Sequence, residues 1–302
     1  MTVAPVQYYT GNAFTSTPHG GGQAAILVLP STDPRLQDDE FKSTTARDFN
    51  LPMIAFHSLL EDGEVPLYSV EWRLPDGNEA PLCGHASLVG AHIIFGLHPD
   101  AKAVEFKTNA RGVVRAEKYP NGEIGIELPL QAAGVPTAEE KARLGHILAS
   151  AAGLPDSAVL EVTTWQEGGA ATAEIGPEVD LGNIKVDIEA LRAIPHHAIL
   201  TQLIGNGDDG VRVNSRVFIP NWGVLEDPVC GSGHSAITAH YLLGPASSRV
   251  AKLVAGGDAS SATLDAKQLS ERGGALKTSL AGKNVRLVGR AWRTGRGELE
   301  VF

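Results

Sequence analysis

Two stretches decide the fold: PLCGHASLVGAHIIF, residues 81–95, and DPVCGSGHSAITAHYLL, residues 227–243. Each has a proline shortly before a Cys-Gly pair, then small polar residues, then an apolar run typical of a buried helix. Cys83 and Cys230 are the only cysteines of the chain, and nearly half its length separates them. A repeat of such long period indicates an internal duplication.

The segments before and after these two stretches predict the same mixture of strands and helices in both halves. Alternating apolar residues predict strands, and a spacing of three to four residues predicts helices. In the first half we expect a helix over 33–51 and strands over 6–14, 23–30, 53–60, 66–75, 103–119 and 124–130. In the second half we expect a helix over 137–154 and strands or short elements over 158–167, 170–176, 184–188, 197–205, 211–224, 275–280, 284–293 and 297–302.

The longer helix of the second half has a recognisable start and end. Thr137 and Glu140 have the spacing of a capping box, and Gly153 stands near the C-terminal end. Many strands around one central apolar helix in each half predict an α+β fold of two pseudo-symmetric halves. We expect residues 1–120, joined by a C-terminal strand over 290–302, to form one half and residues 121–289 to form the other.

Bulk properties exclude several classes of protein. The net charge of −10 and the sequence pI near 5.5 disfavour binding to nucleic acids or anionic membranes. No apolar stretch approaches the roughly 20 residues that a transmembrane helix needs. The N-terminus lacks a basic region and a long apolar core, so it does not resemble a secretory signal. We therefore expect a cytoplasmic protein whose cysteines are thiols, with a homodimer as an option.

The position of the two cysteines indicates acid-base chemistry. The exposed N–H groups and the dipole at a helix N-terminus favour a thiolate over a thiol. A lone cysteine is commonly a small buried apolar residue, but Cys83 and Cys230 occupy equivalent helix starts. One thiolate and one thiol form a matched base and acid, which predicts proton transfer at carbon from opposite faces of a substrate.

The residues after each cysteine are candidates for substrate binding. Backbone N–H groups there can hold a carboxylate and stabilise the enolate-like charge that follows proton removal. The glycines among them could instead only permit the turn into the helix. The candidates are Gly84, His85 and Ala86 in one half, and Gly231, Ser232 and Gly233 in the other.

Other polar residues near the two motifs allow fewer conclusions. Asp227 is either a turn residue before Pro228 or a carboxylate acid or base. His85 and His234 follow the cysteines, but their spacing does not match a zinc motif, so we expect no metal and no cofactor. Ser87 and Ser235 could add hydroxyl donors, whereas His92 and His240 lie further along the helices and are expected to be structural.

Five blocks in the same order resemble the phenazine-biosynthesis PhzF-like family. They are FTSTPHGGGQAAILVL, LCGHASLVGAHIIF, EDPVCGSGHSAI, QLSERGGALKTSL and VRLVGRAWRTGRGEL, between residues 14 and 299. The resemblance implies the diaminopimelate epimerase fold, with the site in the cleft between two similar halves. It also implies that His85 contacts substrate and that Asp227 lines the site.

The chain departs from the family pattern at three places. Met53, in NLPMIAF, stands where the family has its catalytic glutamate, in phrases similar to NLSETAF. Cys230 stands where a threonine is common, and the resulting cysteine pair is similar to that of diaminopimelate epimerase and proline racemase. Gly22-Gln23 replaces the family's usual Asn-Pro.

Three functions follow as hypotheses. The first is a cofactor-independent racemase, epimerase or related isomerase that uses Cys83 and Cys230 on a small carboxylic-acid or amino-acid-like substrate. The second is a PhzF-like isomerase of an unsaturated acid, with Asp227 or His85 in place of the missing glutamate. The third is a non-catalytic small-molecule-binding protein that keeps the fold.

Overall fold

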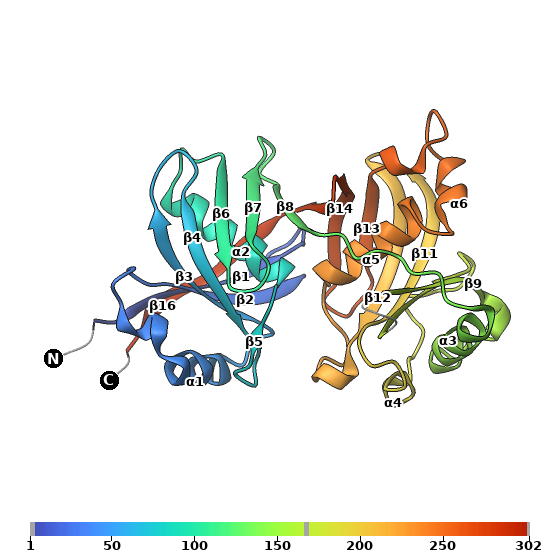
Figure 1. Cartoon of the computed structure of the whole chain (residues 1–302), viewed down its shortest axis with the longest axis horizontal. Coiled ribbons are helices and arrows are strands. Elements are labelled where there is room, and N and C mark those ends of the chain that lie inside the picture. Colours follow the sequence, from blue (N-terminus) through green and yellow to red (C-terminus); the bar gives the residue numbers. More distant parts are fainter. Residues whose placement is uncertain (1–3, 166–168, 301–302) are drawn as a thin grey trace. The chain divides into compact units, whose positions relative to one another are not determined.

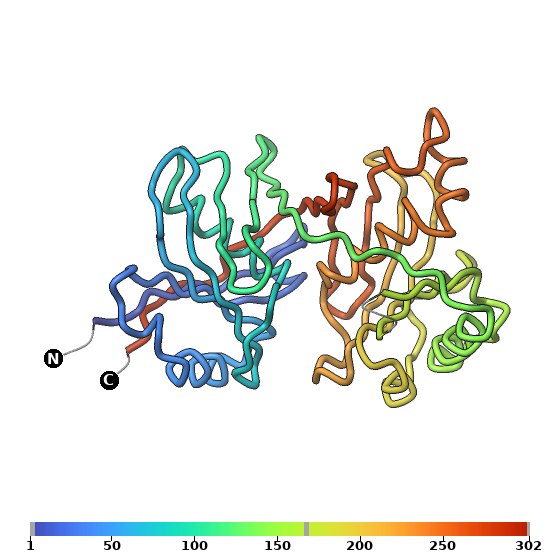
Figure 2. Tube along the Cα trace, in the orientation of Figure 1, coloured from blue at the N-terminus to red at the C-terminus, as the bar shows by residue number. Residues whose placement is uncertain are grey.

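The computed structural model describes residues 4–165 and 169–300 (Figure 1). The chain divides into two compact units, Met1–Glu127 with Val288–Phe302, and Leu128–Leu287. The trace in Figure 2 passes from blue through green in the first unit and returns to it in red at the C-terminal end. Over the described ranges, no helix has the length and apolar character required to cross a membrane.

The first unit is a sheet with one helix buried against it. The sheet order is β16-β1-β2-β3-β4-β6-β7-β8, and β5 pairs with β4. The strands are β1 (Val6–Ala13), β2 (Gly22–Val28), β3 (Ile54–Glu61), β4 (Leu67–Arg73), β5 (Glu79–Ala80), β6 (Ala103–Thr108), β7 (Val113–Lys118), β8 (Ile124–Pro129) and β16 (Ala291–Leu299). The helices are the short η1 (Pro34–Gln37), α1 (Asp39–Phe49) and α2 (Gly84–Leu97).

Helix α2 is the central helix of this unit. It packs against β1, β2 and β16, and eleven of its fourteen residues are buried, so it has no polar face to present to water. Helix α1 packs against β3 and β4, over a cluster of buried apolar residues that includes Ile54 and Phe56.

The second unit has the sheet order β15-β14-β13-β12-β11-β10-β9. Its strands are β9 (Val159–Trp165), β10 (Ala170–Ile175), β11 (Ala198–Gly207), β12 (Gly210–Phe218), β13 (Leu264–Gln268), β14 (Gly274–Ala281) and β15 (Asn284–Gly289). Its helices are α3 (Ala138–Ala151), α4 (Ile188–Leu191), α5 (Gly231–Leu242) and α6 (Ser247–Ala251), with short η2 (Asp156–Ala158), η3 (Pro220–Trp222) and η4 (Ala259–Ser261). In the central α5, every residue except Ser232 is buried.

The two sheets share one pattern of pairing. In the first unit, β1/β2, β3/β4 and β6/β7 are antiparallel, whereas β2/β3 and β4/β6 are parallel. In the second, β9/β10, β11/β12 and β13/β14 are antiparallel, whereas β10/β11 and β12/β13 are parallel. In both units the central helix follows the fourth strand of this series and precedes the fifth. The predicted pseudo-symmetry of the halves is confirmed.

Most predicted elements are present, with some differences at their ends. Thr137 accepts a hydrogen bond from the Glu140 N–H at 3.2 Å, as the capping pattern predicts, and Gly153 has a positive φ of 68°. The expected helix over 33–51 is split into η1 and α1, because Asp38 caps a new helix by accepting from the Phe41 N–H at 2.9 Å. The segment 184–188, predicted as a strand or short element, forms no strand, and α4 begins at its last residue.

Two predicted strands run into residues that the structure does not describe. The strand over 158–167 is described as far as Trp165, and the strand over 297–302 as far as Glu300. Residues 166–167 and 301–302 of these predictions lie outside the described part of the chain.

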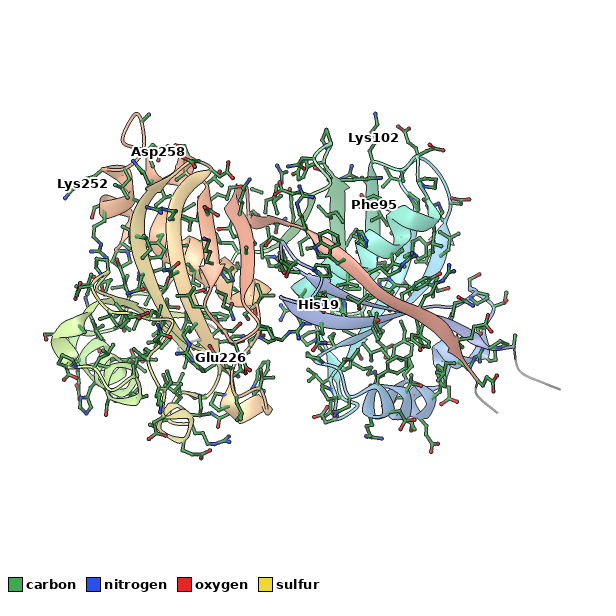
Figure 3. All side chains as sticks on the ribbon, turned by 180° about the vertical axis from the view of Figure 1, so that it is seen from behind. His19, Phe95, Lys102, Glu226, Lys252 and Asp258 are labelled. Carbon is green, nitrogen blue, oxygen red and sulfur yellow. The ribbon has the colours of Figure 1, made fainter. Side chains whose placement is uncertain are left out.

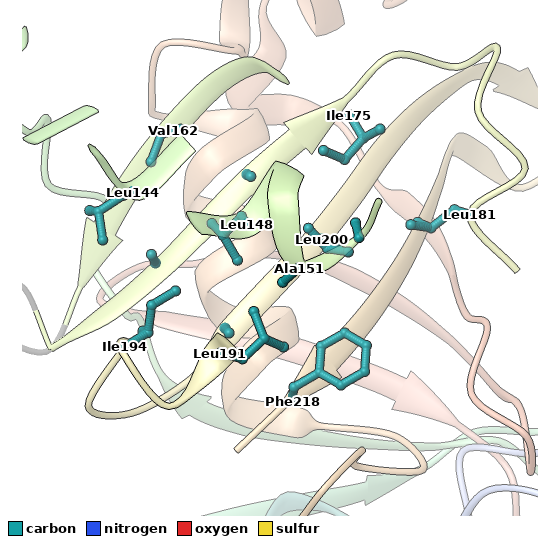
Figure 4. Close-up of a cluster of buried hydrophobic side chains, with 14 residues drawn as sticks. Leu144, Leu148, Ala151, Val162, Ile175, Leu181, Leu191, Ile194, Leu200 and Phe218 are labelled. Carbon is teal, nitrogen blue, oxygen red and sulfur yellow. The ribbon is translucent and has the colours of Figure 1, made fainter. Parts of the chain in front are cut away.

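The core of the second unit gives a stability test. Leu148 of α3 is fully buried among the apolar side chains of Figure 4, which include Leu200 and Phe218. We expect Leu148→Ala to lower the free energy of unfolding by about 3 kcal/mol, since burial is lost and a cavity remains. Leu160→Ala is the matched control, because Leu160 is 45% exposed. Urea denaturation measures both, and equal losses in the two variants would contradict this assignment of the core.

Candidate active site

Both cysteines stand at the N-cap of a central helix, as the sequence predicts. Cys83 precedes α2 with φ −140° and ψ 113°, and Cys230 precedes α5 with φ −95° and ψ 109°. Both residues are buried, and neither forms a disulfide within the described chain. Each cysteine therefore stands at a helix N-terminus, where negative charge is favoured, but only the Cys230 side chain accepts a hydrogen bond from an N–H of its helix.

In the first unit, the thiol of Cys83 contacts an imidazole. Its Sγ lies 3.5 Å from Nδ1 and 3.7 Å from Nε2 of His85, so the sulfur faces the ring beside both nitrogens. The backbone of Gly22 makes room for this ring, because a Cβ atom there would come within 2.8 Å of the His85 Cγ. The departure from the family's Asn-Pro at residues 22–23 thus permits the ring to lie against β2.

His85 is held in its neutral form. Burial lowers the pKa of this histidine to about 4, and a hydrogen bond with the Gln23 backbone acts in the opposite direction. A neutral imidazole can accept a hydrogen bond from a thiol or donate one to a thiolate. Ser87, whose hydroxyl donates to the Cys83 carbonyl at 2.6 Å, stabilises the first turn of α2.

In the second unit, the thiol of Cys230 caps its helix. The Gly233 N–H donates to Sγ at 3.3 Å, and the Ser232 hydroxyl lies 3.4 Å from the same sulfur. The Cys230 N–H donates to Oε1 of Gln268 at 2.9 Å, and the Gln268 amide in turn donates to the Asp227 carbonyl. These contacts fix the sulfur in place and direct donors toward it, which favours the thiolate.

Asp227 lies beside this thiol. Its Oδ1 accepts from the Val229 N–H at 2.9 Å, which is the turn role that its place before Pro228 predicts. The residue is partly exposed, yet protein atoms crowd its carboxyl group, and this desolvation raises the pKa to about 6. Hydrogen bonds from Val229 and Cys230 lower the pKa, and the neighbouring Glu226 (Figure 3), which pairs with Arg216, raises it further. A carboxyl group that titrates near pH 6 can act as an acid or a base.

The structure thus brings the candidates together in two groups. Cys83 and His85 lie together in the first unit, with the buried Gly84 and Ala86 at the start of α2. Asp227, Cys230, Ser232 and Gly233 lie together in the second unit, with the buried Gly231 in the first turn of α5.

The remaining predicted residues have structural contacts. His234 donates through Nδ1 to the Cys230 carbonyl at 2.8 Å, and the Ser235 hydroxyl donates to the Pro129 carbonyl at 2.9 Å. His240 lies 2.9 Å from the Thr163 hydroxyl and 3.3 Å from the Glu174 carboxylate inside the core. Within residues 4–165 and 169–300, no group of three or more His, Cys, Asp or Glu side chains is arranged to hold a metal ion.

Sequence reasoning missed His197, which lies against the Cys230 group. Its Nε2 is 3.3 Å from the Ser232 hydroxyl, and its ring packs on Trp165 with 4.6 Å between centroids and on Trp222 with 5.9 Å. His197 immediately precedes β11, so the available signal was its position as the first residue of the strand predicted over 197–205. That position corresponds to Met53 before β3 in the first half.

The fold and these polar groups define an α+β protein of two repeated units, each with a thiol at the start of its central helix. The chain belongs to the phenazine biosynthesis-like protein family, whose model matches residues 11–295. It is 31% identical over 301 residues to an uncharacterized isomerase of Halalkalibacterium halodurans, covering 99% of each chain. It is 28% identical over 299 residues to an uncharacterized isomerase of Pseudomonas aeruginosa, covering 98% of this chain and 99% of that protein.

Similar proteins also occur in animals and among solved structures. The human phenazine biosynthesis-like domain-containing protein is 27% identical over 289 residues, which are 90% of this chain and 91% of that protein. A crystal structure of a PhzF-family protein from Enterococcus faecalis is similar with a TM-score of 0.77 and 24% identity, covering 99% and 100% of the two chains. The PhzF-family protein of Bacillus anthracis gives a TM-score of 0.70 at 16% identity, covering 99% and 100%. These similarities confirm the predicted α+β fold of the diaminopimelate epimerase type.

Asp227 gives a pH-dependent prediction. The pKa of about 6 in the folded protein lies above the ordinary value of 3.8, so between roughly pH 4 and 6 the folded state binds more protons than the unfolded state. Stability from this group is therefore present at low pH and is lost as the pH rises through 6. Because Asp227→Asn removes this effect, the variant should gain stability relative to the unaltered protein between pH 4 and pH 7.

Urea denaturation at several pH values measures this difference. The control is Asp100→Asn, because Asp100 is an exposed carboxylate of the other unit. The difference in the free energy of unfolding between this control and the unaltered protein should not vary between pH 4 and pH 7. If the stability gained by Asp227→Asn over the unaltered protein stays constant or declines as the pH rises, the raised pKa of Asp227 is excluded.

Proposed function

We propose that this chain is a cofactor-independent isomerase of the racemase or epimerase type, with Cys83 and Cys230 as its acid-base pair. The observation that carries the proposal is the presence of a thiol at the N-cap of the central helix in both repeated units. The names of two relatives as isomerases support the same class of reaction.

The proposed reaction is a proton transfer at carbon. One cysteine, as thiolate, removes the proton next to a carboxylate, and the other, as thiol, donates a proton to the opposite face. No net redox change or group transfer occurs, and the reverse reaction exchanges the two roles. The substrate class is a small carboxylic acid or an amino-acid-like compound.

Groups around each sulfur fit these roles. Backbone N–H groups in the first turns of α2 and α5 can bind a carboxylate and stabilise the enolate-like charge. The Gly233 N–H and the Ser232 hydroxyl favour the thiolate of Cys230, while the neutral His85 can form a hydrogen bond with Cys83. Because the surroundings differ, we expect the two thiols to have different pKa values.

A second candidate function is the isomerisation of an unsaturated acid with Asp227 as the proton carrier. The observation that favours it is the pKa of about 6 for the Asp227 carboxyl, which lies beside the Cys230 thiol. In this reaction the carboxylate would replace the family's glutamate, whose place the buried Met53 occupies. A methionine side chain cannot carry a proton, so Met53 cannot take the role of the family's glutamate.

The two functions are separated by hydrogen exchange in heavy water. The probes are the D and L forms of proline and the LL and meso forms of diaminopimelate, together with a β,γ-unsaturated carboxylic acid. We expect the unaltered protein to exchange the α-hydrogen of both stereoisomers of one amino-acid probe and to interconvert them. Mass spectrometry follows the exchange, and chiral chromatography follows the inversion.

Cysteine variants test the acid-base pair. Cys230→Thr restores the family-like residue and keeps a side-chain oxygen that can cap α5, so the fold should persist. Its hydroxyl does not ionise in the useful pH range, so inversion should fall by at least about 100-fold, the low end of general acid-base effects.

Cys83→Ser and Cys230→Ser serve as each other's controls. Each should lose inversion but retain α-hydrogen exchange with only one stereoisomer, and the retained stereoisomer should be opposite in the two variants. Inversion at an unchanged rate in Cys230→Thr would refute the pair. Isomerisation of the unsaturated acid that Asp227→Asn abolishes would favour the second function.

A further inference from the structure

His197 occupies the same place in the second unit as Met53 in the first. The Met53 carbonyl accepts from the Ala25 N–H at 3.0 Å, just before the parallel pairing of Ala25 with Ile54. The His197 carbonyl accepts from the Ala171 N–H at 2.9 Å, just before the parallel pairing of Ala171 with Ala198. The position that holds an apolar side chain in one repeat therefore holds an imidazole in the other.

The second residue after each cysteine also differs between the units, but here it is the first unit that has the imidazole. The second residue after Cys83 is His85, whose ring contacts the sulfur directly. The second residue after Cys230 is Ser232, whose hydroxyl lies 3.4 Å from Sγ and 3.3 Å from Nε2 of His197. Each thiol thus has one imidazole, directly in the first unit and through a hydroxyl in the second.

We propose that His197 is a positioning residue for Cys230 and that it orients the Ser232 hydroxyl toward the sulfur and so stabilises the thiolate. In both states the Nε2–H of His197 donates to Ser232 Oγ, and the Ser232 O–H donates to Sγ. The thiol S–H donates to the Asp227 carboxyl group, and the hydrogen bond from Ser232 becomes stronger when the sulfur is charged. This inference deepens the proposed function, because it assigns a support for one of its two thiols.

The surroundings of His197 suit both states. The ring is buried, and burial lowers its pKa to about 4, with His196 acting in the same direction. A neutral ring can have its proton on Nε2, which is the tautomer that donates to Ser232. Nδ1 has no hydrogen-bond partner among the described residues, so no contact there favours the other tautomer. Trp165 and Trp222 keep the ring plane in place.

Other titratable groups lie near the chain of contacts. Asp227 contacts the Cys230 thiol, and its negative charge above about pH 6 opposes formation of the thiolate. His234 donates to the Cys230 carbonyl, and burial lowers its pKa to about 4, so it is neutral over the useful range. His196 packs against Trp222 at 5.2 Å between centroids, on the side of His197 and not at the sulfur.

The test is a pH titration of Cys230 that needs no substrate. Because the chain has only two cysteines, the Cys83→Ser protein reports Cys230 alone through the ultraviolet absorbance of its thiolate. We expect His197→Phe, which keeps an aromatic ring between the tryptophans, to raise the midpoint by about one pH unit, the size of a lost hydrogen bond to a charged group. His197→Gln, which can still donate to Ser232, should restore most of the difference, and the control His196→Gln should leave the midpoint unchanged.

The double variant distinguishes a relay from two separate effects. Ser232→Ala should raise the midpoint at least as much as His197→Phe does, and His197→Phe should add nothing in the Ser232→Ala background. An additive shift, or an unchanged midpoint in His197→Phe, would overturn the proposal. If circular dichroism shows that His197→Phe is unfolded, the comparison is made with His197→Asn, whose shorter amide does not reach the hydroxyl.

The result of the Cys230 titration does not depend on whether the proposed function is correct. Shifted midpoints without isomerisation of any probe would leave the relay standing and refute the isomerase. Inversion with a Cys230 midpoint that does not respond to His197→Phe would leave the isomerase standing and refute the relay.

Discussion

The burial of the two central helices is the constraint on which the rest of the structure depends. Helices α2 and α5 are covered on nearly every side, so each must be surrounded by its own sheet and the loops around it. Sequestering such a helix leaves its first N–H groups away from bulk water, where they need acceptors. At α5 the Cys230 sulfur is one acceptor, and at α2 the Cys83 sulfur stands beside the same kind of N-terminus. The packing of the core and the polarity of the candidate site are therefore consequences of one arrangement.

A buried thiol at an N-cap is subject to two opposing effects. Desolvation favours the neutral thiol, whereas helix N–H groups and hydroxyl donors favour the thiolate. The balance differs between the two units, since Cys230 receives the Gly233 N–H and Cys83 faces the His85 ring. The neighbouring Asp227, with its pKa raised to about 6, adds a charge beside the Cys230 sulfur that changes near that pH.

Much of the fold could be predicted from the sequence because its signals are local. The Thr137 cap, the alternating strands and the apolar runs after each cysteine depend on neighbouring residues only. The segment 184–188, predicted as a strand or short element, forms no strand, because the pattern of apolar residues does not report whether a neighbouring strand is there to pair with. His197 was missed because its significance depends on parallel pairing between β10 and β11, which places it as Met53 is placed in the other unit. Spatial equivalence of this kind becomes visible only after the strand register is known.

The duplication also explains how the imidazoles differ between the units. Residues 85 and 232 are equivalent by their distance from the cysteines, and residues 53 and 197 by strand register. One unit has histidine at the first position and methionine at the second, and the other has serine and histidine. Burial keeps both rings neutral, with pKa values of about 4 for His85 and His197. The exchange therefore changes the geometry around each sulfur and not its charge. His85 contacts its sulfur directly, whereas His197 reaches the other sulfur through the Ser232 hydroxyl.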